Sequence, residues 1–362
     1  MDRKLERIFN QFQIATKFVS FQELNSGHIN DTFLIKTTQR PNYVLQKLNG
    51  TVFKDAAKLI VNKVLISNHL QEKLVHLPVS EIQRKVLCFV ASKKGDFFYK
   101  DVDGNYWNLS VFIEDSVTYE KTPNAAIAFE AGKATGNFLA LTADFKAAEL
   151  TPILPDFHSV SKRFLQFEEA LAKASKERKK QAKELIDFSN SHITEMVALD
   201  DAIRLKKLPL RVTHSDTKIS NILFSKEHKA LCLIDTDTVM EGVIHFDYGD
   251  AIRTICNTSD EDCSDIHQIG FHFEYFKKYT EGFLQELKQS ISSEELKYLS
   301  VSIQIMPFIM GLRFLTDFLH DDVYYKTSYE HHNFDRSKNQ YTLVQKIKEK
   351  YSEIEAFIES AF

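Results

Sequence analysis

The first third of the chain alternates short apolar runs with turn residues, which is the pattern of β-strands. FVSFQEL (18–24) and DTFLIKT (31–37) flank the turn NSGHIN, and YVLQKL (43–48) follows QRPN. Such runs predict a meander of antiparallel strands. KVLCFVAS (85–92) and DFFYKDVDGNYWNLSVFI (96–113) predict further strands, with a hairpin turn at the Asp-Gly pair inside the second of them.

One helix interrupts this region, and helices dominate the rest of the chain. FKDAAKLIVNKVLISNHLQEK (53–73) has apolar residues at helical spacing. After IEDSVTYE, residues 124–145 and 159–203 are helical in pattern, and helices continue to the end apart from two strands near residue 220. We therefore expect an α+β fold of two lobes: a small antiparallel-sheet lobe at 1–113 and a larger, mainly helical lobe at 114–362.

Composition narrows the class of protein without identifying it. The net charge of −4 provides no basic field for nucleic acid. The four cysteines are far apart and form no C-x-x-C pair, as expected for reduced thiols. The start MDRKLERIFNQF has no apolar signal segment, and VSIQIMPFIMGL is interrupted by Gln304 and Pro307. We expect a cytoplasmic protein with no membrane, nucleic-acid or obligate protein partner.

Candidate chemistry is concentrated in VTHSDTKISNILF (212–224). His214, Asp216 and Asn221 form H-x-D-x-x-x-x-N, and the apolar run LCLI then delivers Asp235 to a turn. A polar loop between two strands often carries Asp, Asn and Ser only for turn hydrogen bonds. The spacing to Asp235 and the strand-rich region upstream favour catalysis instead, with His214 as an orienting residue rather than an acid or base.

These residue types suit phosphoryl transfer, which needs positioning and charge neutralisation more than covalent participation by the protein. Asp216 would orient the attacking hydroxyl and accept its proton. Asn221 and Asp235 offer the hard oxygen ligands that Mg²⁺ prefers. Lys218 would steady the transferring phosphoryl group as a point charge. The sequence thus predicts a kinase that uses ATP and Mg²⁺.

HSDTKISN with LIDTD resembles the catalytic and metal-binding loops of one enzyme superfamily. This superfamily contains the aminoglycoside phosphotransferases and choline kinases, which share the two-lobed fold of protein kinases. Four further segments are SGHINDTFLIKT, YVLQKLNGTVFKD, GDAIRT and GLRFLTDFLHDDVYYKT. Together they are similar to the bacterial N-acetylhexosamine 1-kinases, which phosphorylate the anomeric hydroxyl of GlcNAc or GalNAc with ATP.

The resemblance implies a nucleotide site in the first lobe. The loop NSGHINDTF would cover the phosphates, and the backbone of the segment WNLSVFIED would meet adenine. Lys47 would face the phosphates, although a shift of one residue would place Gln46 there. The helix at 53–73 has no Glu before Glu72, so the lysine–glutamate pair of protein kinases has no evident partner except Asn62. The implied nucleotide residues are Gly27, His28, Asn30, Lys47, Phe112 and Glu114.

The acceptor site is implied by the C-terminal segment and by the residue two positions after Asp235. Arg313 and Asp317 have the i, i+4 spacing of an ion pair, but with Asp322 and Tyr324 they would also ring a sugar. Asp237 would serve a second metal, a sugar hydroxyl or only the turn. In HFDYGDAIRT, the two aspartates fit capping of a helix N-terminus.

Alternatives from other classes of protein remain open. Choline, homoserine and aminoglycoside kinases of the same superfamily are the enzyme alternatives, and a pseudokinase that only binds is the non-enzyme alternative. A P-loop kinase is excluded because the only Gly-Lys pair is followed by Ala134. The presence of Asp216, Asn221 and Asp235 argues against a pseudokinase.

Overall fold

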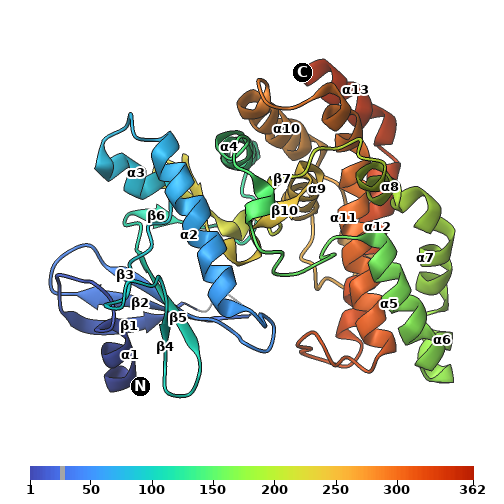
Figure 1. The fold of residues 1–362 in the computed structure, drawn as a ribbon. Coiled ribbons are helices and arrows are strands. Elements are labelled where there is room, and N and C mark those ends of the chain that lie inside the picture. Colours follow the sequence, from blue (N-terminus) through green and yellow to red (C-terminus); the bar gives the residue numbers. More distant parts are fainter. Residues whose placement is uncertain (25–28) are drawn as a thin grey trace. The chain divides into compact units, whose positions relative to one another are not determined.

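The computed structural model describes residues 1–24 and 29–362, which form two compact units (Figure 1). Unit 1 comprises Met1–Thr118, Leu141–Leu154 and Asn221–Glu241, and unit 2 the remaining residues. This division differs from the expected boundary after residue 113. The reason is a three-stranded sheet in which β6 (Ser116–Val117) pairs with β8 (Ile222–Ser225), so a later segment of the chain joins unit 1.

A five-stranded antiparallel sheet forms the centre of unit 1, in the order β1-β2-β3-β5-β4. Its strands are β1 (Phe18–Glu23), β2 (Asp31–Thr37), β3 (Tyr43–Lys47), β4 (Tyr99–Lys100) and β5 (Tyr106–Val111). The register places Leu45 opposite both Phe33 and Leu109, and all three are buried. The predicted meander is confirmed. The predicted strand at 85–92 is wrong, because only Phe89 makes an isolated bridge to this sheet.

Apolar clusters join helices to this sheet. Leu5 and Phe9 of α1 (Asp2–Phe9) pack with sheet residues that include Trp107. Leu59, Ile60 and other residues of α2 (Ala56–Lys73) form a second cluster, which includes Leu48, the residue after β3, and Figure 1 shows α2 running alongside the sheet. Unit 1 also contains α3 (Val79–Lys85), η1 (Ala147–Glu149), β9 (Ala230–Leu233) and η3 (Thr236–Thr238).

Helices build unit 2 around α11 (Ser293–Leu319), which begins with a capping box formed by Ser292 and Glu295. Its buried apolar residues pack with those of α5, α7, α8, α9 and α12. The other helices are α4 (Ala125–Leu141), α5 (Val160–Lys173), α6 (Lys176–Gln181), α7 (Lys183–Met196), α8 (Ala198–Arg204), α9 (Ile244–Ile255), η4 (Ile266–Gln268), α10 (Phe273–Leu287), α12 (His332–Lys348) and α13 (Tyr351–Ala361), and unit 2 also contains the strand β7 (Arg211–Thr213). The chain passes from one unit to the other within η2 (Ile219–Asn221) and β10 (Met240–Gly242), and at the last residue of α4.

The two-lobed expectation is confirmed: a small antiparallel-sheet unit is combined with a mainly helical one. By length and composition α11 could cross a membrane, but 78% of its most apolar window is buried inside the protein. Packing in the core of unit 2 thus accounts for its apolar sequence.

All four cysteines are free thiols. Cys232 in unit 1 and Cys256 in unit 2 are buried, whereas Cys88 and Cys263 are half-buried. Burial raises the pKa of Cys232 to about 12 and the pKa of Cys256 well above its usual value.

Candidate active site

Asp216, the predicted base, lies in the loop after β7 in unit 2, where Ser215 adopts a positive φ of 65°. Its side chain is 29% exposed, and its Oδ2 atom lies 3.1 Å from Nζ of Lys218. The carboxylate is therefore accessible to a substrate and has a cation beside it. Lys218 is 34% exposed, and its predicted contact with the transferring phosphoryl group stays a prediction.

Asp247 of α9 holds this loop in place. Its Oδ2 accepts the N–H of His214 at 2.8 Å, its Oδ1 accepts the N–H of Ser215 at 2.7 Å, and its backbone carbonyl accepts the hydroxyl of Thr217 at 2.5 Å. Burial raises the pKa of Asp247 to about 7, and the two N–H donors act in the opposite direction. Asp247 is thus a positioning residue for Asp216.

The predicted capping role is wrong for both aspartates of this segment. The residue before α9 is Val243, and no side chain caps the helix. Asp247 lies inside the first turn, and Asp250 forms a buried ion pair with Arg253, which also binds Glu261. The sequence signal for this role of Asp247 was a carboxylate among apolar neighbours on a helix. Such a carboxylate is expected to be buried, and a buried carboxylate needs hydrogen-bond donors inside the protein.

His158 fixes the same loop through a second contact. Its Nε2 lies 3.1 Å from the carbonyl oxygen of Ser215, so a neutral imidazole donates there. Burial lowers the pKa of His158 to about 3, with Arg313 and Arg163 contributing in the same direction. The ring stays uncharged near neutral pH and acts as a fixed donor. No motif in the sequence pointed to it.

Two arginines form a cationic, aromatic-lined cluster next to His158. The guanidinium of Arg313 lies 5.2 Å from the ring centre of Phe157 and 5.5 Å from that of Tyr325. Arg163 donates to the carbonyl of Phe157 at 2.9 Å. Burial, followed by the charge of Arg313, lowers the pKa of Arg163 to about 10. Within the described part of the chain, neither arginine forms an ion pair with a carboxylate.

The predicted acceptor residues Asp317 and Asp322 are engaged within unit 2. The buried Asp317 carboxylate accepts the N–H groups of Tyr324 at 2.8 Å and Tyr325 at 2.9 Å, so it makes no ion pair with Arg313 in the described structure. Asp322 pairs with Arg178 at 2.8 Å. These bonds hold the segment that carries Tyr325, while Tyr324 is 66% exposed.

The predicted metal ligands occupy one end of the β8–β9 hairpin in unit 1. The N–H of Ile234 donates to the carbonyl of Asn221 at 2.8 Å, which places Asn221 beside the residue preceding Asp235. Asp235 has a positive φ of 59° and directly precedes η3. One amide and one carboxylate oxygen suit Mg²⁺. The described residues contain no cluster of three or more His, Cys, Asp or Glu side chains for a metal.

The predicted adenine segment offers backbone groups to a ligand. The N–H of Phe112 donates to Asn42 at 2.9 Å, and the carbonyl of Glu114 accepts from Arg84 at 2.6 Å. The carbonyl of Phe112 and the N–H of Glu114 have no hydrogen-bond partner among the described residues. One acceptor and one donor are therefore available there. Gly27 and His28, predicted above the phosphates, lie outside the described residues.

The structure separates Lys47 from its neighbour Gln46. Lys47 is 32% exposed and pairs with Asp31 at 3.1 Å. Gln46 instead faces the buried Asp237, which also binds Asn30 and Lys63. Asn62 is not a substitute for the missing glutamate, because its side chain bonds the backbone of Thr151 and Val239.

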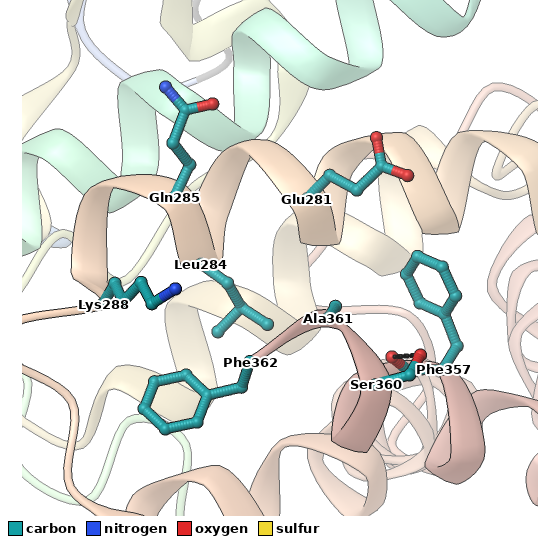
Figure 2. Close-up of a pocket in the computed structure, with 8 residues that line it drawn as sticks. All are labelled: Glu281, Leu284, Gln285, Lys288, Phe357, Ser360, Ala361 and Phe362. Atoms are coloured by element: carbon teal, nitrogen blue, oxygen red, sulfur yellow. Dashed lines mark hydrogen bonds between the residues drawn. The ribbon is translucent and has the colours of Figure 1, made fainter.

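The pocket drawn in Figure 2 belongs to another part of unit 2. It lies where the end of α13 meets α10, and Leu284, Lys288, Phe357 and Phe362 contribute to its lining. None of the predicted site residues lines it.

Comparison with known proteins agrees with this fold. Residues 20–281 match the model of the phosphotransferase enzyme family. An aminoglycoside phosphotransferase from Alicyclobacillus acidocaldarius superposes with a TM-score of 0.60 at 12% identity, covering 98% of this chain and 96% of that one. A choline kinase from Cryptosporidium parvum gives 0.57 at 16% identity, with 95% and 93% covered. Because the family match spans most of the chain and includes the loop held by Asp247, the protein belongs to the phosphotransferase enzyme family.

Proposed function

We propose that the protein is an ATP-dependent kinase that phosphorylates a sugar hydroxyl, namely the anomeric hydroxyl of an N-acetylhexosamine. The family match supports phosphoryl transfer, and the resemblance of the sequence to N-acetylhexosamine 1-kinases supports the sugar. The structural observation that carries the choice of acceptor is the cluster of Arg313 and Arg163 with Phe157.

This cluster discriminates between acceptors by charge. Choline and aminoglycosides are cations, and two guanidinium groups without a carboxylate partner among the described residues would repel them. A neutral acetamido sugar offers carbonyl and hydroxyl oxygens, which accept hydrogen bonds from arginine. Its apolar ring face would pack on Phe157 or Tyr325. The cluster lies near the base because His158, adjacent to Phe157, binds the backbone of Ser215.

In the proposed reaction, Asp216 accepts the proton of the anomeric hydroxyl. The hydroxyl oxygen forms a bond to the γ-phosphorus as the bond to the ADP oxygen breaks, so the products are a sugar 1-phosphate and ADP. Asp247 and His158 hold the loop so that Asp216 needs little reorganisation. Asn221 and Asp235 would hold Mg²⁺, which when bound neutralises phosphate charge.

A coupled assay of ADP release tests the activity directly. ATP would be offered with GlcNAc, GalNAc, choline, ethanolamine, homoserine and an aminoglycoside. ADP release with the two amino sugars alone is expected. Release only with a cationic acceptor would overturn the sugar assignment, and no release with any acceptor would favour a binding protein.

Arg313→Ala tests the acceptor cluster. The variant is expected to raise the KM for the sugar by about 10-fold or more while changing the KM for ATP little, because a charge-assisted hydrogen bond contributes about 1.5–3 kcal/mol. Arg204→Ala is the matched control, since Arg204 is exposed and pairs only with Asp201 among the described residues. Equal increases in both KM values would mean that Arg313 is structural.

A further inference from the structure

A buried polar cluster in unit 1 contains a lysine that the predicted chemistry does not use. Lys63 of α2 forms an ion pair with Asp237, and each side chain is only 4% exposed. Nζ of Lys63 also donates to Oε1 of Gln46 at 2.9 Å, and Asn108 donates to the same oxygen at 3.0 Å. Asn30 completes the cluster by donating to the Asp237 carboxylate.

The energetics of this cluster do not favour a purely structural purpose. Removing an ammonium and a carboxylate from water costs several kcal/mol per ion on the order-of-magnitude scale, and apolar residues of similar size often stabilise a fold as well or better. Every oxygen of Asp237 and Gln46 has a donor in the cluster. The lysine differs, because its three N–H groups have two hydrogen-bond acceptors among the described residues, Gln46 and Asp237, while Nζ also lies 5.5 Å from the ring centre of Phe89.

The position of the cluster points to the nucleotide. Gln46 lies on β3 next to Lys47, in the strand from which a cation was expected to face the phosphates. Asp237 lies two residues after Asp235, a predicted ligand of the metal on those phosphates. In protein kinases the lysine is on the strand and its carboxylate partner on the following helix. Here the strand provides an amide, and the helix provides the ammonium.

We propose that Lys63 of α2, and not a lysine of β3, is the cation that contacts the phosphates of the nucleotide, with Asp237 and Gln46 as its positioning residues. The inference rests on the proposed use of ATP. Asp237 accepts one N–H of Lys63 and Gln46 accepts a second, and the third donor would bind a phosphate oxygen. Asp237 thereby acts through Lys63, and the exposed pair of Lys47 with Asp31 belongs to the surface.

A series of ligands that differ only in phosphate number tests this contact. Dissociation constants for adenosine, ADP and ATP would be measured by calorimetry, with Mg²⁺ present, for the wild type and Lys63→Gln. Loss of a charge-assisted contact should weaken ATP binding by about 10-fold to 100-fold and adenosine binding by less than about 3-fold. Lys58→Gln is the matched control on the same helix, because Lys58 is exposed and pairs with Asp55.

Lys63→Gln leaves the buried Asp237 without its cation, so its folding would be checked by thermal melting. If it does not fold, Lys63→Gln/Asp237→Asn removes both charges and takes its place in the same measurement. An ATP-selective loss in the folded variant supports the contact. An equal loss for adenosine and ATP, or an ATP-selective loss in Lys47→Gln instead, would overturn it.

The same measurements separate this inference from the proposed function. A wild-type protein that binds neither ADP nor ATP and releases no ADP would remove the proposed function itself. Wild-type binding that strengthens with phosphate number, together with unchanged ATP affinity in Lys63→Gln, would overturn only the assignment of Lys63.

Discussion

Asp216 has an accessible carboxylate with a cation beside it. The proposed base must reach the hydroxyl of the acceptor. Its side chain is 29% exposed, and its Oδ2 lies 3.1 Å from Nζ of Lys218.

Asp216→Asn should therefore separate chemistry from binding. Asparagine keeps the shape of the side chain but accepts no proton, so kcat should fall by about 10²-fold to 10⁴-fold. The affinity for ATP should change by less than about 3-fold, because Asp216 contacts the acceptor and not the nucleotide in the proposed reaction. Steady-state kinetics and calorimetry measure the two quantities. A variant with more than about a tenth of wild-type turnover would remove Asp216 from the role of base.

His158 makes stability depend on pH in a defined direction. Its pKa is about 3 in the folded protein and about 6.5 when unfolded, so between these values only the unfolded chain binds the proton. The free energy of unfolding is fully retained above about pH 6.5 and decreases by about 1.4 kcal/mol per pH unit below it. His245, with a pKa of about 4, acts with the same sign.

His158→Gln should reduce this sensitivity to acid. Glutamine keeps a donor for the carbonyl of Ser215 but does not titrate in this range. Urea unfolding at about pH 7 and about pH 4.5 is expected to show a loss on acidification that is smaller by about 2–3 kcal/mol in the variant. Equal losses in both proteins would mean that protonation of His158 does not contribute to the pH dependence of the free energy of unfolding.

At the scale of elements, α9 supports the loop that carries the proposed base. One carboxylate on this helix bonds two successive N–H groups, those of His214 and Ser215. Asp247→Asn leaves one acceptor oxygen for two donors and turns an amide N–H₂ toward one of them. The variant should lower kcat by about 10-fold or more and the free energy of unfolding by about 1–3 kcal/mol.

A positioning role for Asp247 predicts a particular kinetic pattern. The KM for ATP should stay within about 3-fold of the wild-type value, because the substitution displaces the loop and leaves the proposed nucleotide contacts of unit 1 intact. Asp201→Asn, at an exposed carboxylate of α8, is the matched control. Loss of stability without loss of kcat would limit Asp247 to a role in folding.

The elements show how far local pattern determines structure. The strands of 18–48 and the helix at 53–73 were predictable because alternation and helical spacing are local properties. Residues 159–203 read as helical throughout, yet they divide into α5, α6, α7 and α8. The serine that caps α6, Ser175, marks one break, but caps alone do not reveal where tertiary packing ends a helix. Residues 85–92 have strand composition, but they pair with β5 only through a single bridge between Phe89 and Ser110 and form no strand.

For the whole molecule, long-range pairing explains the features that the sequence does not reveal. The motif from Asp216 to Asp235 could be recognised because its spacing is fixed within one stretch of chain. Asp247, His158 and Lys63 could not, because each is a single residue whose role depends on contacts distant in sequence. The return of residues 221–241 to unit 1 depends on strand pairing of the same kind.

The cysteines provide an internal probe of how the molecule opens. A thiol reagent attacks an accessible thiolate, so Cys232 and Cys256 should react only when their own unit unfolds locally or globally. The rate of labelling at each thiol, followed by peptide mass spectrometry, would thus report the rate at which each unit opens in the wild-type protein. ATP, proposed to bind unit 1, is expected to slow the labelling of Cys232. Equal slowing at Cys256 would show that the two units open as one cooperative block, whereas an unchanged rate there would show that they open independently.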